Sequence, residues 1–301
     1  MHSPLRFLSR SSRFTRSALA TGLATATLGL AAAVGAPAAS ALGSSNGTVA
    51  TPNIPRCESD IVVLVPGGGN TVPGLPDNFP VGAYVSDLGA MVEKLGYSTS
   101  RTVSYNAAPF VETAYTESRA DGVAKTRQLV AQTAAQCPSS TISLAGYSLG
   151  ADVASRVVAD IANGSGPIDS DKFGSAALIS NPNRSPETVP GGSARGNEGV
   201  FGALDGGYGE LTDRVMDVCN SADYICNSTD RTQNTRAHAT EFTEFAAERD
   251  GDQVATASPS DAALLAAEVP FDLVPGQAAH ATSYGGNGGV NPAYGFLNRH
   301  F

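Results

Sequence analysis

A short glycine-containing segment between a predicted strand and a predicted helix is the strongest constraint on how this chain folds. Thr141–Ala145 is typical of a buried strand, and Gly146-Tyr147-Ser148-Leu149-Gly150 follows it directly. Ala151–Ala162 then has the apolar spacing of a helix. So tight a strand-to-helix turn leaves no room for bulk on either side of its central serine, which explains the glycines. The segment therefore predicts an α/β fold with Ser148 exposed above the edge of a sheet.

Strands and helices alternate along the rest of the chain. The predicted strands are Asp60–Val65, Ser100–Tyr105, Thr141–Ala145, Ser175–Ser180 and Arg214–Val218, and Arg214–Val218 is the last strand of the core. The predicted helices are Gly82–Leu95, Thr113–Gln136 and Ala151–Ala162. This alternation is typical of a parallel sheet with helices on both faces. We therefore expect a three-layer α/β/α sandwich around a central, mainly parallel sheet.

The N-terminus has the organisation of an export signal. Four arginines precede the apolar stretch Ala18–Val34, and the small residues Ala39-Ser40-Ala41 offer a cleavage site. We expect a signal peptide at residues 1–41, with an uncleaved membrane anchor as the alternative. A flexible segment at 42–55 and one domain at 56–301 should follow. The mature protein is then expected to be secreted or to lie in the cell envelope.

Composition and charge exclude several classes of protein. The 301 residues are 42% hydrophobic and 16% charged, which argues against a disordered polyelectrolyte, a collagen-like repeat and a coiled coil. A formal net charge of −9 argues against a nucleic-acid partner. The glycine-rich loop Gly67–Asn70 lacks the Gly-Lys-Ser/Thr of a phosphate loop, and no Cys or His pair has zinc-ligand spacing. We expect no cofactor, no metal ion and a monomeric protein.

Four cysteines remain after the expected signal peptide, and an even number in an exported protein predicts two disulfides. Three pairings are possible. Cys219 and Cys226 flank a short polar turn, so we expect them to pair with each other, which leaves Cys57 for Cys137.

Ser148 is a candidate nucleophile, and a serine hydroxyl needs a base that an acid holds in place. With this nucleophile turn, the acid should follow a later strand and the histidine should come last. Asp223, between Cys219 and Cys226, meets this condition, whereas Asp213 and Asp217 have the pattern of solvent-facing or turn residues.

Two histidines compete for the role of the base. His238 opens a predicted helix, and His280 lies in a loop of small residues. Their spacing from the other candidates does not separate them. An oxyanion hole also requires two backbone N–H groups. The Leu149 N–H and an N–H of the glycine-rich loop, around Gly68, are the candidates.

Several of these segments together resemble the cutinase-like serine esterases. The resemblance rests on GYSLGADVA around Ser148, on the Cys219–Cys226 segment with Asp223 inside it, and on YTESRADG at Tyr115–Gly122. Asn163–Ile168, Phe201–Leu204 and the Cys57/Cys137 pair extend it. Within the family, the chain looks most like the exported cell-envelope lipases of mycolic-acid-containing actinobacteria.

The resemblance implies a role for Asp223 as the catalytic acid and favours His280 over His238. Cutinases have a Tyr shortly after the catalytic His, then a glycine-rich turn and a final helix, and Tyr284 with the segment after it is similar to that ending. The envelope relatives carry an insertion between the Asp and the His, which here would be about 227–279. The family's usual Gln after the nucleophile is Leu149 here, and its frequent Ser or Thr near the oxyanion is Gly68.

These features predict a secreted serine esterase that cleaves carboxylic or lipid esters through an acyl-enzyme intermediate. Its partner would be a lipid or other ester substrate, and any association with the cell envelope would be peripheral. One alternative is a thioesterase or phospholipase of cell-envelope mycolate metabolism. Another, from a different class, is a catalytically silent envelope protein that binds lipid.

Overall fold

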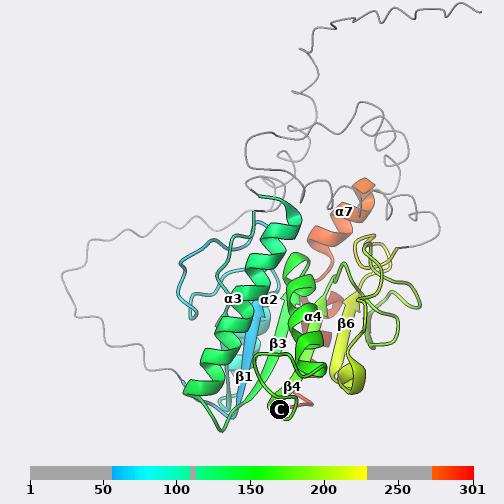
Figure 1. Ribbon diagram of the computed structural model, residues 1–301. Coiled ribbons are helices and arrows are strands. Elements are labelled where there is room, and N and C mark those ends of the chain that lie inside the picture. Colours follow the sequence, from blue (N-terminus) through cyan, green and yellow to red (C-terminus); the bar gives the residue numbers. More distant parts are fainter. Residues whose placement is uncertain (1–55, 109–112, 229–272) are drawn as a thin grey trace, which may run out of the picture. The chain divides into compact units, whose positions relative to one another are not determined.

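A parallel sheet forms the centre of the computed structural model, which describes residues 56–108, 113–228 and 273–301 (Figure 1). These residues belong to one unit, Ile54–Phe301. The six strands in the described residues are β1 (Asp60–Val65), β2 (Ser98–Thr102), β3 (Thr141–Tyr147), β4 (Phe173–Ile179), β5 (Val189–Gly192) and β6 (Val215–Cys219). They lie in the order β2-β1-β3-β4-β6-β5, and every pair is parallel.

The central strands are mostly apolar because both faces of the sheet are covered. Successive side chains of a strand point to opposite faces. Val63 and Val65 of β1 accordingly pack into one hydrophobic cluster, and Val62 and Leu64 pack into another. β3 and β4 divide their side chains between the same two clusters, so the molecule has a core on each side of its sheet.

In the described residues, two helices cover each face of the sheet. α3 (Tyr115–Gln136) and α4 (Leu149–Ala162) contribute to the first cluster, and α2 (Val85–Glu93) and α8 (Val290–Leu297) contribute to the second. The three-layer α/β/α sandwich expected from the sequence is therefore confirmed. No helix in the described residues is long and apolar enough to cross a lipid bilayer.

Two strands differ most from the sequence prediction, while β3, β4 and β6 differ in their bounds by one or two residues. β2 begins and ends earlier than the predicted Ser100–Tyr105, because Ser98 and Thr99 pair with β1 while Ser104 turns its hydroxyl to the Val72 carbonyl. β5 was not predicted, since its sequence Val-Pro-Gly-Gly has no strand pattern. It lies at the edge of the sheet, where a proline and glycines are tolerated.

Both disulfides have the expected pairing. Cys57 and Cys137 join the segment before β1 to the residue after α3, and Cys219 and Cys226 close a short loop after β6. In the loop-entropy account, the long bridge stabilises the fold by about 4.5 kcal/mol and the short one by about 2.5 kcal/mol. Disulfides are typical of proteins outside the cytoplasm.

Candidate functional site

Ser148 lies on a strained turn between β3 and α4. Its φ of 55° and ψ of −123° are unusual for a residue with a side chain, and its side chain is only half-buried. A Cβ atom on Gly146 would lie 2.3 Å from the Gly150 carbonyl oxygen, and one on Gly150 would lie 2.1 Å from the Val65 carbonyl oxygen. Both glycines are therefore required where they stand, and the turn presents the Ser148 hydroxyl at the carboxyl end of the sheet.

His280 links Ser148 to Asp223. Its Nε2 lies 2.9 Å from the Ser148 Oγ, and its Nδ1 lies 3.0 Å from Oδ2 of Asp223. An ionised carboxylate can only accept, so it selects the tautomer with a proton on Nδ1 and leaves Nε2 to accept from the serine hydroxyl. The structure thus brings together three of the residues singled out in the sequence. His238 lies outside the described residues.

The backbone around His280 is helical, so the loop expected there is wrong. His280 occupies the last turn of α7 (Leu273–Thr282), which begins inside the segment expected to be an insertion at 227–279. Pro275 is tolerated because the first-turn N–H groups of a helix have no intrahelical partner, and alanines around His280 favour helix. Most of that expected insertion lies outside the described residues.

Two tyrosines hold the end of α7 in place. The Tyr147 hydroxyl donates to the His280 carbonyl at 2.8 Å, and the Tyr84 hydroxyl donates to the Ala281 carbonyl at 2.5 Å. These are carbonyls that the end of a helix leaves without intrahelical partners. The Tyr147 ring also stacks on the imidazole, with ring centroids 5.3 Å apart. The imidazole is thereby fixed above Ser148.

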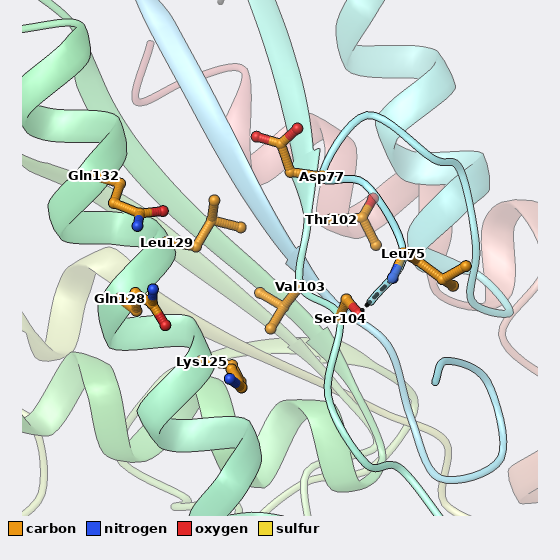
Figure 2. A pocket seen from close by; sticks show the side chains of 9 residues that line it. All are labelled: Leu75, Asp77, Thr102, Val103, Ser104, Lys125, Gln128, Leu129 and Gln132. Atoms are coloured by element: carbon orange, nitrogen blue, oxygen red, sulfur yellow. Dashed lines mark hydrogen bonds between the residues drawn. The ribbon is translucent and has the colours of Figure 1, made fainter. Parts of the chain in front are cut away.

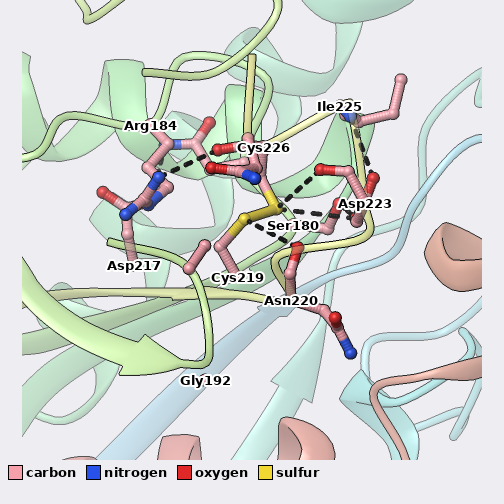
Figure 3. Close-up of a disulfide and its surroundings, with 12 residues drawn as sticks. Ser180, Arg184, Gly192, Asp217, Cys219, Asn220, Asp223, Ile225 and Cys226 are labelled. Atoms are coloured by element: carbon pink, nitrogen blue, oxygen red, sulfur yellow. Dashed lines mark hydrogen bonds between the residues drawn. A yellow bond between two sulfur atoms is a disulfide. The ribbon is translucent and has the colours of Figure 1, made fainter. Parts of the chain in front are cut away.

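Asp223 lies in the loop that the Cys219–Cys226 disulfide closes, as Figure 3 shows. Its side chain is fully buried, and its Oδ1 accepts from the Ile225 N–H at 2.9 Å. Oδ2 accepts from the Tyr284 hydroxyl at 2.6 Å, in addition to its contact with His280. Burial alone would raise the pKa of Asp223, but the hydrogen bonds and the charge of His280 outweigh it and hold that pKa below its usual value.

The glycine-rich loop after β1 lies against the serine turn. A Cβ atom on Gly67 would lie 2.9 Å from the Tyr147 carbonyl oxygen and 3.4 Å from the Ser148 Cβ, so the two segments touch. Within the described part of the chain, neither the Gly68 N–H nor the Leu149 N–H donates a hydrogen bond. Both are free to bind negative charge.

A separate hollow lies beside α3, away from these groups. Figure 2 shows this hollow, whose volume is about 170 Å³, between the end of β2 and α3. Its lining residues are Leu75, Asp77, Thr102, Val103, Ser104, Lys125, Gln128, Leu129 and Gln132. They include neither Ser148 nor its hydrogen-bonded partners. Among the residues that the structure describes, no group of three or more His, Cys, Asp or Glu could hold a metal ion.

Asp217 is buried, so the prediction that it faces solvent is wrong. It lies in β6 with 1% of its surface exposed, and it accepts from the Asn181 amide at 3.0 Å and from the Thr188 hydroxyl at 2.8 Å. Burial raises the pKa of Asp217 to about 6, although these donors and the charge of Arg184 oppose the rise. Asp213, in contrast, is exposed as expected.

The raised pKa of Asp217 predicts a pH-dependent stability. Because the folded state binds the proton more tightly than the unfolded chain, this group stabilises the fold fully below pH about 4, and that stabilisation is lost as the pH rises to about 6. The free energy involved is at most about 3 kcal/mol. The side chain in Asp217→Asn stays uncharged, so the Tm of this variant should fall less than that of the unmodified protein as the pH rises from about 4 to about 6.

Thermal unfolding at several pH values measures the difference, with Asp213→Asn as the exposed control. Parallel curves for all three proteins would contradict the prediction.

Comparison with known proteins identifies a relative that carries the name of a carboxylesterase. The Carboxylesterase Culp6 homolog of Corynebacterium glutamicum is 30% identical over 144 residues, with 39% of this chain and 45% of that protein covered. The chain therefore spans less than half the length of that relative.

A solved structure with low sequence identity to this chain shows the same architecture. Lysin B from Mycobacteriophage D29 has a TM-score of 0.54 and 16% identity over 80% of this chain and 99% of its own, so the two share a fold. The catalytic core domain of acetyl xylan esterase from Trichoderma reesei has a TM-score of 0.45 and 17% identity over 64% of this chain and 96% of its own. The Cutinase family model matches residues 58–249, well over half of the sequence. The chain belongs to the cutinase family.

Proposed function

We propose that this protein hydrolyses carboxylic esters through an acyl-enzyme formed on Ser148. The observation that carries the proposal is the chain of contacts in which His280 Nε2 lies 2.9 Å from the Ser148 Oγ and Nδ1 lies 3.0 Å from Asp223. A nucleophile, a base and a group that orients the base are the three parts that acyl transfer to serine requires. The relative from Corynebacterium glutamicum carries the name of a carboxylesterase, which supports the same reaction.

In the first half of the proposed reaction, the ester acylates the serine. The Ser148 Oγ forms a bond to the ester carbonyl carbon while its proton moves to His280 Nε2. The tetrahedral intermediate then collapses, the bond to the alcohol oxygen breaks, and Nε2 returns the proton to the departing alcohol. The acyl group remains on Ser148 and the imidazole is neutral again.

In the second half, water releases the acyl group. His280 Nε2 takes a proton from water while the water oxygen bonds to the acyl carbon. Nε2 then gives this proton to the Ser148 Oγ when the bond between that oxygen and the acyl carbon breaks. The product is the carboxylic acid. Asp223 stays ionised throughout and stabilises the imidazolium that forms in each half.

The carbonyl oxygen becomes negatively charged in both tetrahedral intermediates. We assign its stabilisation to the unpartnered N–H groups of Gly68 and Leu149, which lie in two segments that touch beside Ser148. Leu149 is the first residue of α4, so the positive end of the helix dipole also faces the site. A leucine after the nucleophile does not affect this role because only its backbone donates.

We further propose that the substrate is a lipid or other carboxylic ester outside the cytoplasm. The export-signal pattern at residues 1–41 and the two disulfides support this location.

Hydrolysis of p-nitrophenyl esters with short, medium and long acyl chains tests the proposal. We expect turnover of these esters and covalent labelling by a fluorophosphonate, with a preference among chain lengths that identifies the acyl group. Faster turnover of a matched thioester would assign the protein to thioesters instead. An intact protein that neither turns over esters nor reacts with the fluorophosphonate would be a lipid-binding protein, and the proposal would be wrong.

A further inference from the structure

Ser180 lies in the centre of the site, although neither the serine turn nor the disulfide loop includes it. It directly follows β4, which lies between β3 and β6 in the sheet. Ser148 follows β3, and Asp223 lies in the loop after β6. The carboxyl ends of parallel strands meet at one edge of a sheet, so Ser180 stands between the serine and the aspartate.

The Ser180 hydroxyl touches both partners of the proposed base. Its Oγ lies 2.8 Å from His280 Nδ1, a shorter distance than the 3.0 Å from Nδ1 to Oδ2 of Asp223. The same hydroxyl donates its own proton to that Oδ2. The Nδ1–H therefore has two acceptors, the hydroxyl and the carboxylate, and the hydroxyl also connects them. The three groups form a closed triangle with no surface of Ser180 exposed.

The backbone of Ser180 is held in a conformation that favours glycine. Its φ is 52°, and a residue with a Cβ atom pays about 1 kcal/mol or more to remain there. Two contacts fix the turn: the Ser180 N–H donates to the Val218 carbonyl at 2.8 Å, and the neighbouring Asn181 amide donates to the buried Asp217 at 3.0 Å. Strain of this kind concentrates at functional sites, and here its consequence is to aim a hydroxyl at His280.

We propose that Ser180 is a positioning residue for His280, an inference that rests on the proposed function of Ser148, His280 and Asp223. Its hydroxyl fixes the plane of the imidazole by giving Nδ1–H a second acceptor. When Nε2 receives the proton from Ser148, the hydroxyl and the carboxylate share the Nδ1–H of the resulting imidazolium. The proton that the hydroxyl donates to Oδ2 also keeps the carboxylate ionised beside the base.

Two substitutions distinguish the effect of the Ser180 hydroxyl from the effect of the backbone strain. Ser180→Ala and Ser180→Gly both remove the hydroxyl, but only the glycine relieves the strain at φ 52°. Both should lower kcat for a p-nitrophenyl ester by about 10-fold, the effect of one lost hydrogen bond to a charged group. KM should stay within about twofold, because the two halves of the reaction use the same base and slow together. A purely structural role would instead make activity follow the Tm of each variant.

Ser175→Ala is the matched control. Ser175 is a fully buried serine of β4, the strand that Ser180 directly follows, and its hydroxyl has no hydrogen-bond partner among the described residues. This variant should keep the kcat of the unmodified protein. Less than a twofold change in kcat in both Ser180 variants, or an equal loss in Ser175→Ala, would overturn the role of Ser180.

A proton NMR measurement on the unmodified protein tests the contact without any substitution. The downfield Nδ1–H resonance of His280 should show a nuclear Overhauser effect to the Cβ protons of Ser180, and its absence with the resonance present would overturn the proposal. If no such resonance is observed, the kinetic result decides. If, in addition, neither Ser180 variant folds, the absence of the resonance counts against the contact. Failure of the proposed function is distinguishable, since either the unmodified protein would then turn over no ester or Ser148→Ala would retain full activity, whatever the Ser180 variants do.

Discussion

Replacement of Ser148 by alanine is expected to lower kcat/KM for ester hydrolysis by about 10³-fold or more while the protein remains folded. The hydroxyl is the atom that bonds to the acyl carbon, and no other described hydroxyl lies within hydrogen-bond distance of His280 Nε2. Alanine keeps the Cβ atom that the turn already accommodates at φ 55°. The loss of one hydrogen bond should shift the Tm by only a few degrees.

Steady-state kinetics and thermal unfolding of the same preparation measure these two effects. The buried Ser175→Ala variant controls for the loss of a serine elsewhere in the sheet. Ester hydrolysis at the unmodified rate in a folded Ser148→Ala protein would remove Ser148 from the mechanism.

Replacement of His280 by alanine should lower turnover by about three orders of magnitude. Without the imidazole, the Ser148 hydroxyl has no base to take its proton, and the negative charge of Asp223 loses its partner. The controls are His238→Ala and His300→Ala. His300 lies beyond the end of α8, with its Nδ1 2.9 Å from the Phe296 carbonyl oxygen, and the structure gives it no contact with Ser148.

Both control variants are expected to retain most of the activity, as measured by kcat/KM on one p-nitrophenyl ester. Loss of activity in His238→Ala with retention in His280→Ala would transfer the role of the base to His238. Ser148 and Asp223 would keep their assignments in that case.

Much of the fold was predictable because the sheet is covered on both faces. Asp60–Val65 contains an unbroken apolar run from Ile61 to Val65, and β1 has the predicted bounds. β5 was not predictable in the same way, since an edge strand is stabilised by its pairing with β6 and not by its own apolar residues. The bounds of β2 shifted for a related reason, because its sequence Ser-Thr-Ser-Arg-Thr has no apolar pattern and its pairing with β1 fixes its residues.

The residues of the site also differ in whether local sequence features mark them. Ser148 and Asp223 were identifiable because local features mark them, a glycine turn and a short cysteine loop. Ser180 and Asp217 were not, since their partners come from other strands and loops. The order of the parallel strands was the one available signal for Ser180, because a serine at the end of the strand between β3 and β6 must lie near both. Spacing in the sequence could not choose His280, although the resemblance to cutinases favoured it, and the structure adds its contact with Ser148.

The most direct test of the central claim is to trap the acyl-enzyme. The protein is mixed with a p-nitrophenyl ester, quenched in acid during turnover, digested and analysed by mass spectrometry. We predict that the peptide containing Ser148 gains the mass of one acyl group, that fragmentation places the group on Ser148, and that Ser148→Ala shows no such peptide. An acyl group on a different residue, or turnover without any acylated peptide under conditions that preserve a stable acyl-serine standard, would contradict the account.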